Sequence, residues 1–136
     1  MTHSAAWHHQ STIRVRGYEL DSYRHVNHAV YLSYLEQARW EYLASRGLSL
    51  QRLDELQRWP VVAKLEIEYL KPAFMDDELV IVSRLTELSK ASLRIEHEIR
   101  RGDVVITRAR LRAGIIDETG RPAAAPESFQ ALGEPA

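Results

Sequence analysis

The sequence contains no cysteine, which excludes disulfides, cysteine-based zinc sites and a thiol nucleophile. No apolar run approaches the roughly 20 residues that a membrane-spanning helix needs. The net charge of −1 gives no basic excess for binding nucleic acid or a membrane surface. The chain also lacks a glycine-rich phosphate loop and a Gly-x-Ser-x-Gly nucleophile motif. We therefore expect a cytoplasmic protein whose partners include neither nucleic acid nor a membrane.

The length of 136 residues suits one domain that spans residues 1–136. Residues 1–10 lack an apolar core followed by a cleavage site, so we interpret them as a loose lead-in rather than a signal peptide. Residues 127–136 follow a stretch with repeated alanine and proline, and we expect this tail to fray. There is no internal repeat and no sign of a second domain.

The hydrophobic pattern predicts one strand, one long helix and then four strands. In part of residues 11–20, apolar and charged residues alternate, which is typical of a strand. From Ala29 the apolar residues follow helical spacing, with Asn27 as the predicted N-cap and Gly47 as the stop. The buried stripe of this helix consists of Val30, Tyr31, Tyr34, Leu35, Ala38, Tyr42 and Leu43. Residues 48–57 allow a short second helix.

After Trp59 the apolar residues recur at every second position, which predicts strands. The short links between these strands predict antiparallel pairing. The fold class is therefore α+β, with the helix packed on one face of the sheet.

The segment just before the long helix concentrates groups that can transfer protons. Asp21, His25, Asn27 and His28 lie within eight positions. A helix start also presents unpaired backbone N–H donors with partial positive charge. Such a combination can polarise a carbonyl group and attack it. From spacing alone, an ordinary loop or capping role for Asp21 stays open, as does a simple cap for Asn27.

Three blocks of the sequence resemble the 4-hydroxybenzoyl-CoA thioesterase-like family of hot-dog-fold acyl-CoA thioesterases. The first block contains Asp21, His25-Val26-Asn27, Tyr31, Tyr34, Glu36 and Ala38-Arg39; the second contains Glu68-Tyr69-Leu70-Lys71-Pro72-Ala73 and Asp76-Asp77; the third is Lys90-Ala91-Ser92. The resemblance implies a hot-dog fold, in which a five-stranded antiparallel sheet wraps a long central helix. The chain departs from many relatives by carrying Arg24 where glycine is common.

The resemblance implies hydrolysis of an acyl-CoA thioester to a free carboxylic acid and coenzyme A. It assigns Asp21 as the general base or nucleophile, and backbone N–H groups around His28 and Ala29 as the oxyanion hole. His25 either positions Asp21 or a water molecule, or is an ordinary loop histidine. His28 contributes through its ring or only through its backbone. Glu36 is the secondary catalytic candidate, because another branch of hot-dog thioesterases uses a helix glutamate.

The remaining predicted contacts concern the substrate. Tyr31 and Tyr34 either line the acyl pocket or belong to the core, and Lys90 is a candidate for the coenzyme A phosphates by resemblance. His97 sits at an apolar strand position, and we expect a core histidine with its hydrogen bonds satisfied. We expect no metal site, and no cofactor beyond the coenzyme A of the substrate and product.

The resemblance also implies a homodimer, or a homotetramer built as a dimer of dimers, with the active site at the subunit junction. Three other functions stay open from the sequence. The first is a thioesterase for acyl-acyl-carrier protein in place of acyl-CoA. The second is a hydratase or dehydratase on the same fold. The third is a non-catalytic acyl-binding module.

Overall fold

A computed structural model describes residues 6–136 as a single sheet with helices against it. The strands are β1 (His9–Arg14), β2 (Trp59–Tyr69), β3 (Glu78–Leu88), β4 (Ser92–Arg101) and β5 (Val104–Ile116); the helices are α1 (Val30–Ser45) and α2 (Leu50–Leu56), with 3-10 helices η1 (Gly17–Glu19) and η2 (Glu127–Gly133). The five strands are all antiparallel and lie in the order β1-β3-β4-β5-β2. The α+β prediction is confirmed.

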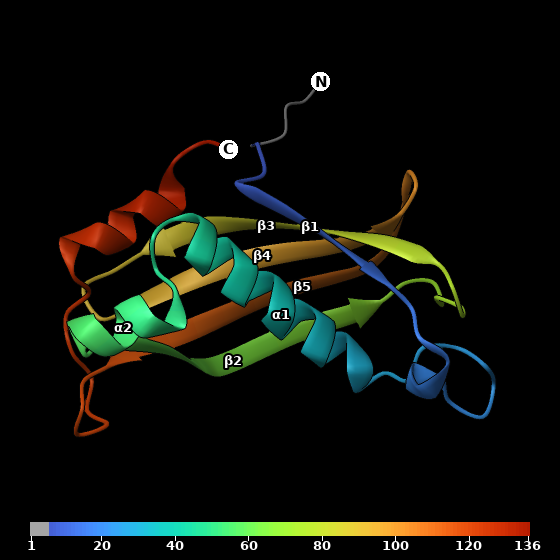
Figure 1. The fold of residues 1–136 in the computed structure, drawn as a ribbon, viewed down its shortest axis with the longest axis horizontal. Helices are drawn as coiled ribbons and strands as arrows, with labels where there is room; N and C mark the ends of the chain where they lie inside the picture. The colour runs from blue at the N-terminus through green and yellow to red at the C-terminus, as the bar shows by residue number, and fades with distance from the viewer. Residues whose placement is uncertain (1–5) are drawn as a thin grey trace.

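Helix α1 lies across one face of this sheet (Figure 1). Its apolar stripe is buried as the spacing predicted, and only Val30, in the first turn, stays partly exposed. The stripe divides between two clusters. Tyr31 and Tyr34 pack with Leu79 and Ile99 beneath the first half of the helix, whereas the second half packs into a separate cluster with Leu93 and Leu111. Each fully buried large apolar side chain contributes about 1.5–3 kcal/mol to stability.

The start of α1 differs in detail from the predicted cap. The helix begins at Val30, and Asn27 lies three residues before it rather than at the N-cap. The Ala29 N–H donates to Asn27 Oδ1 at 2.9 Å, and the Val30 N–H donates to the Asn27 carbonyl at 2.9 Å. Asn27 therefore closes the turn that leads into the helix. The predicted stop is confirmed, because Gly47 follows the helix with a left-handed φ of 78°.

Parts of the two terminal segments expected to be loose belong to secondary structure, at residues 9–10 and 127–133. Strand β1 starts at His9, inside the expected lead-in, and pairs with β3; residues 1–5 lie outside the described part. The expectation of a frayed tail is wrong, because η2 places Phe129 and Leu132 in the second cluster with no exposure to solvent. Arg46 at the end of α1 donates hydrogen bonds to the η2 carbonyl of Ala131 at 2.6 Å and to the His8 carbonyl.

His97 is a core histidine, as predicted, but only half of its hydrogen bonding is satisfied. Its Nδ1 lies 2.8 Å from the Ser83 hydroxyl. Its buried Nε2 has no partner among residues 6–136. Burial, and then the charge of Arg39, lower the pKa of His97 to about 3, so the ring is neutral at ordinary pH.

Candidate active site

Asp21 organises the loop that precedes α1. Its Oδ1 accepts hydrogen bonds from the N–H groups of Tyr23 at 2.8 Å and His25 at 3.1 Å. Its own N–H donates to the His25 carbonyl at 2.7 Å, and the Arg24 N–H donates to the Asp21 carbonyl at 3.0 Å. The side chain of an aspartate commonly stabilises a turn in this way. The hydrogen bonds within the described chain use Oδ1 and leave Oδ2 available.

Arg24 adopts a left-handed backbone conformation, with φ at 64°. Glycine reaches this region without steric cost, whereas other residues pay about 1–2 kcal/mol. This conformation gives a physical reason for the glycine that the resembling family commonly carries here. Arg24 keeps the turn but carries that strain.

The Asp21 loop, the start of α1 and the end of β2 line an open surface cavity of about 250 Å³. It is lined by Asp21, His25, Val26, His28, Tyr31, Tyr69, Leu70, Lys71 and Pro72. Tyr69 ties β2 to the helix start, because its hydroxyl donates to the His28 carbonyl at 2.9 Å. The Tyr69 and His28 rings meet edge-on, with centroids 6.4 Å apart. The structure therefore brings the predicted residues Asp21, His25, His28 and Tyr31 to one cavity.

The two histidines of the loop contribute differently. His25 acts on Asp21 through its backbone N–H, while its ring stands perpendicular to Phe74 at 5.2 Å. His28 is exposed, and its N–H has no partner within the described chain. The Ala29 N–H is already taken by Asn27. Of the two amides expected to hold a substrate oxygen, only that of His28 is therefore available.

The two tyrosines predicted as candidate pocket residues have different surroundings. Tyr31 lines the cavity, and burial raises the pKa of its hydroxyl, so it stays protonated. Tyr34 does not line this cavity, contrary to its assignment as a substrate contact. It is 2% exposed, and its hydroxyl donates to Glu19 Oε1 at 2.7 Å. Tyr34 therefore belongs to the core, which was the alternative interpretation from helical spacing.

Glu19 is a buried carboxylate that the sequence analysis missed. It lies in η1, two residues before Asp21, and is 6% exposed. Besides Tyr34, it binds Arg16 through the backbone N–H at 2.8 Å and the guanidinium at 2.7 Å. Burial opposes the charge, but these hydrogen bonds outweigh burial and hold the pKa of Glu19 below its ordinary value. The i, i+3 spacing of Arg16 and Glu19 was the only signal in the sequence.

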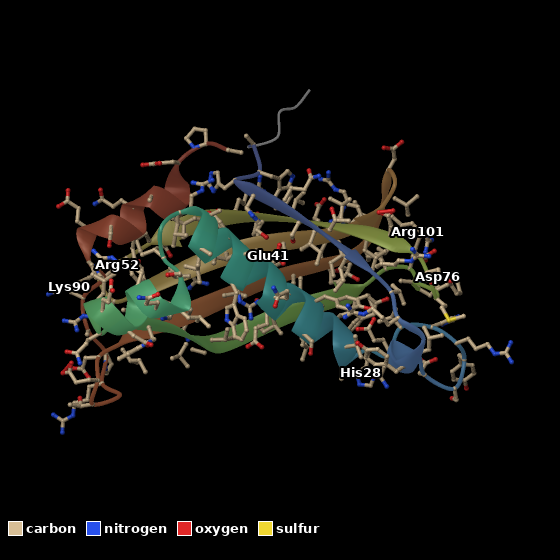
Figure 2. The ribbon with its side chains drawn as sticks, viewed as in Figure 1. His28, Glu41, Arg52, Asp76, Lys90 and Arg101 are labelled. Carbon is tan, nitrogen blue, oxygen red and sulfur yellow. The ribbon has the colours of Figure 1, made fainter. Side chains whose placement is uncertain are left out.

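Two predicted residues lie away from this cavity. Glu36 is exposed on α1 and lines a different, mainly apolar cavity of about 400 Å³ together with Arg39, Trp40 and Trp59. Lys90 lies in the link between β3 and β4, and Figure 2 shows it at the opposite end of the molecule from His28. A single chain does not bring Lys90 to the Asp21 cavity.

Comparison with known proteins agrees with this fold. The arrangement of one long helix on a five-stranded antiparallel sheet is the hot-dog fold that the resemblance implied. The family model of the Thioesterase-like superfamily matches residues 15–132, and the chain belongs to that superfamily. The crystal structure of YbaW, a probable thioesterase from Escherichia coli, matches with a TM-score of 0.83 and 32% identity, covering 93% of this chain and 100% of YbaW.

Two curated relatives are similar in sequence. The long-chain acyl-CoA thioesterase FadM of Escherichia coli (strain K12) is 43% identical over 83 residues, which are 61% of this chain and 62% of FadM. The match thus spans just under two thirds of the FadM length. The acyl-CoA thioesterase YbgC of Haemophilus influenzae is 31% identical over 121 residues, 88% of this chain and 89% of YbgC.

The structure of residues 6–136 also bears on two other kinds of site. No group of three or more histidine, aspartate or glutamate side chains in this range has an arrangement that could hold a metal ion. Within the same range, every helix is too short or too polar to cross a membrane.

Proposed function

We propose that the protein is an acyl-CoA thioesterase that uses Asp21 as its catalytic carboxylate. The observation that carries this proposal is the position of Asp21 in the cavity at the start of α1. One of its oxygens is held by two loop amides, and the other is available. The similarity to FadM and YbgC supports the thioester as substrate.

The proposed reaction adds water to the thioester carbonyl and expels the thiolate. As a general base, Asp21 takes a proton from the water molecule while the new carbon–oxygen bond forms. As a nucleophile, Asp21 would form an anhydride that water then hydrolyses. In both cases the carbon–sulfur bond breaks, and coenzyme A leaves as a thiolate. Because the thiolate is a good leaving group, the site needs little acid assistance.

The carbonyl oxygen becomes negatively charged in this step and needs a hydrogen-bond donor. The free N–H of His28, at the positive end of α1, is the group we assign to it. This role uses the backbone, so His28→Ala should keep most of the turnover. A loss of about 100-fold or more in kcat would instead assign the step to the imidazole ring.

We propose that the active form is a homodimer, alone or paired into a tetramer. Strand β2 is an 11-residue edge strand with unpaired backbone groups on one side. Val61 and Val62 on this strand are 47% and 44% exposed, and Trp40 on α1 is 44% exposed. A long edge strand with apolar side chains pairs readily with a second copy. Light scattering coupled to gel filtration tests this, and a fully active monomer would refute it.

The test of function compares Asp21→Asn with Asp117→Asn. Asp117 makes the same type of hydrogen bonds in another turn, with its Oδ1 accepting from Thr119 N at 2.8 Å and Arg121 N at 3.1 Å. Thiol release is measured with saturated acyl-CoA esters of increasing length and with benzoyl-CoA. We expect Asp21→Asn to lose about 100- to 10,000-fold in kcat. Asp117→Asn should keep the wild-type rate.

Two outcomes would overturn the proposal. One is near-wild-type thiol release by Asp21→Asn on every ester that the wild type cleaves. The other is wild-type protein that hydrates an enoyl-CoA but releases no thiol. The same panel, repeated with acyl-acyl-carrier protein, identifies the preferred carrier.

A further inference from the structure

We propose that Glu19 and Tyr34 form a brace that fixes the position of the Asp21 loop relative to the start of α1. The two residues are positioning residues, because neither lines the Asp21 cavity. The inference rests on the proposed function, since it concerns the geometry of that site.

The brace connects the two halves of the site directly. Glu19 lies in η1, two residues before Asp21 along the chain. Tyr34 lies one turn beyond Val30, where α1 begins. Their hydrogen bond of 2.7 Å, between the Tyr34 hydroxyl and Glu19 Oε1, therefore ties the segment that carries the carboxylate to the helix that presents the amide.

The backbone of Glu19 adds a second tie to the same loop. Its carbonyl accepts from the Asn27 N–H at 2.9 Å, on the far side of the turn that contains Asp21. Asn27 in turn holds the Ala29 amide. Glu19 thus contacts α1 through its side chain and the entry to α1 through its main chain.

The surroundings make the brace rigid. Glu19 and Tyr34 are 6% and 2% exposed, so water does not compete for their hydrogen bond. Arg16 supplies both an N–H and a guanidinium group to the same carboxylate, which keeps it charged. Burial and Glu19 raise the pKa of Tyr34, so its hydroxyl remains a donor. The Glu19 carboxylate therefore accepts from three donors, which together hold it in one position.

The test compares Tyr34→Phe with Tyr42→Phe. Both tyrosines lie on α1 and are fully buried, and the Tyr42 hydroxyl donates to the Leu132 carbonyl at the other end of the helix. Each variant loses one buried hydroxyl, so both should lower the melting temperature. A displacement of about 1 Å in a catalytic group can cost about 100-fold in rate. We expect Tyr34→Phe to lower kcat about 10- to 100-fold with little change in KM, and Tyr42→Phe to keep the wild-type kcat.

Substitutions at Glu19 give an independent measurement. Glu19→Gln retains an oxygen that can accept from Tyr34, whereas Glu19→Ala retains none. We expect Glu19→Gln to recover part of the kcat that Glu19→Ala loses. If the pair acts as a unit, Glu19→Ala combined with Tyr34→Phe should be no slower than Glu19→Ala alone.

The outcomes separate the brace from the proposed function. If Asp21→Asn abolishes turnover while folded Tyr34→Phe and Glu19→Ala both keep the wild-type kcat, the brace is wrong and the function stands. Equal kcat losses in Tyr34→Phe and Tyr42→Phe would also refute the brace, because the effect would then follow from stability. If Asp21→Asn itself keeps full turnover, the proposed site fails instead.

Discussion

The chain builds the same turn twice, once at residues 21–25 and once at residues 117–121. In each turn the first residue is an aspartate whose Oδ1 accepts from the amides two and four residues later. Its N–H donates to the carbonyl four residues later, at 2.7 Å from Asp21 and 2.9 Å from Asp117. The fourth residue is left-handed in both, with φ of 64° at Arg24 and 82° at Gly120.

The two turns differ in what surrounds them. The first turn runs into α1, lies beside a cavity and is followed by the free His28 amide. The second joins β5 to the tail, and its aspartate is further bound by the Thr119 hydroxyl at 2.6 Å. The aspartate turn is thus a local structural motif, and its tertiary surroundings make one copy a candidate active site.

The largest change in stability is expected from a substitution in the packing near the second turn. Phe129 in η2 has no exposure and packs in the second cluster with Ile115 and Tyr42. Phe129→Ala should lower the free energy of unfolding by about 3–5 kcal/mol, because it leaves a cavity. Urea unfolding measures this loss. The folded fraction should keep its specific activity, and a selective fall in kcat would show that the two ends of α1 are coupled.

Gly120→Ala tests the backbone of the second turn. An added Cβ would meet no atom within 4 Å, so the cost comes from the left-handed φ alone. We expect a loss of about 1–2 kcal/mol in the free energy of unfolding. The measurement is again urea unfolding, with kcat unchanged. If Gly120→Ala left the free energy of unfolding unchanged, the backbone of the second turn would be able to relieve the strain, unlike that of the first turn.

Arg24→Gly is the reverse substitution in the first turn. It relieves the left-handed strain but increases the entropy of the unfolded chain by an amount worth about 0.5–1 kcal/mol. We expect a net gain of about 1 kcal/mol or less by thermal unfolding. Stability should change in opposite directions in Arg24→Gly and Gly120→Ala. A clear destabilisation by Arg24→Gly would indicate that the arginine side chain makes a stabilising contribution of its own.

The smallest expected effect is on the pKa of Asp117 in the second turn and on the stability that depends on it. The hydrogen bond from the Thr119 hydroxyl, followed by those from the Arg121 and Thr119 amides, lowers the pKa of Asp117. A lowered folded-state pKa adds stability above the unfolded pKa, and this stability is lost as pH falls through the folded value. Thr119→Ala should raise the pKa of Asp117 toward its ordinary value. Carboxyl NMR titration measures it, and an unchanged pKa would contradict the assigned cause.

The sequence predicted α1 and β4 well because their patterns are local, whereas the strand predicted over residues 11–20 ends at Arg14 and gives way to η1. The buried stripe of α1 and the alternation of β4 follow directly from helical and strand periodicity. The tail resembles a loop in composition, and only contact with α1 and the sheet makes Phe129 a core residue. Helical spacing leaves Tyr34 open between the acyl pocket and the core, because it shows which face is buried but not which partner a hydroxyl will find.

The sequence by itself therefore determined the α+β class, the helix and its stop at Gly47, and the cluster of Asp21, His25 and His28 before that helix. These properties depend on residues that are close along the chain. The tertiary structure alone decided that the Tyr69 hydroxyl binds the His28 carbonyl, that the His28 amide stays free, and that Glu19 meets Tyr34 across 15 positions. These contacts join segments whose separation in sequence carries no periodic signal, and only the packing of α1 against the sheet brings them together.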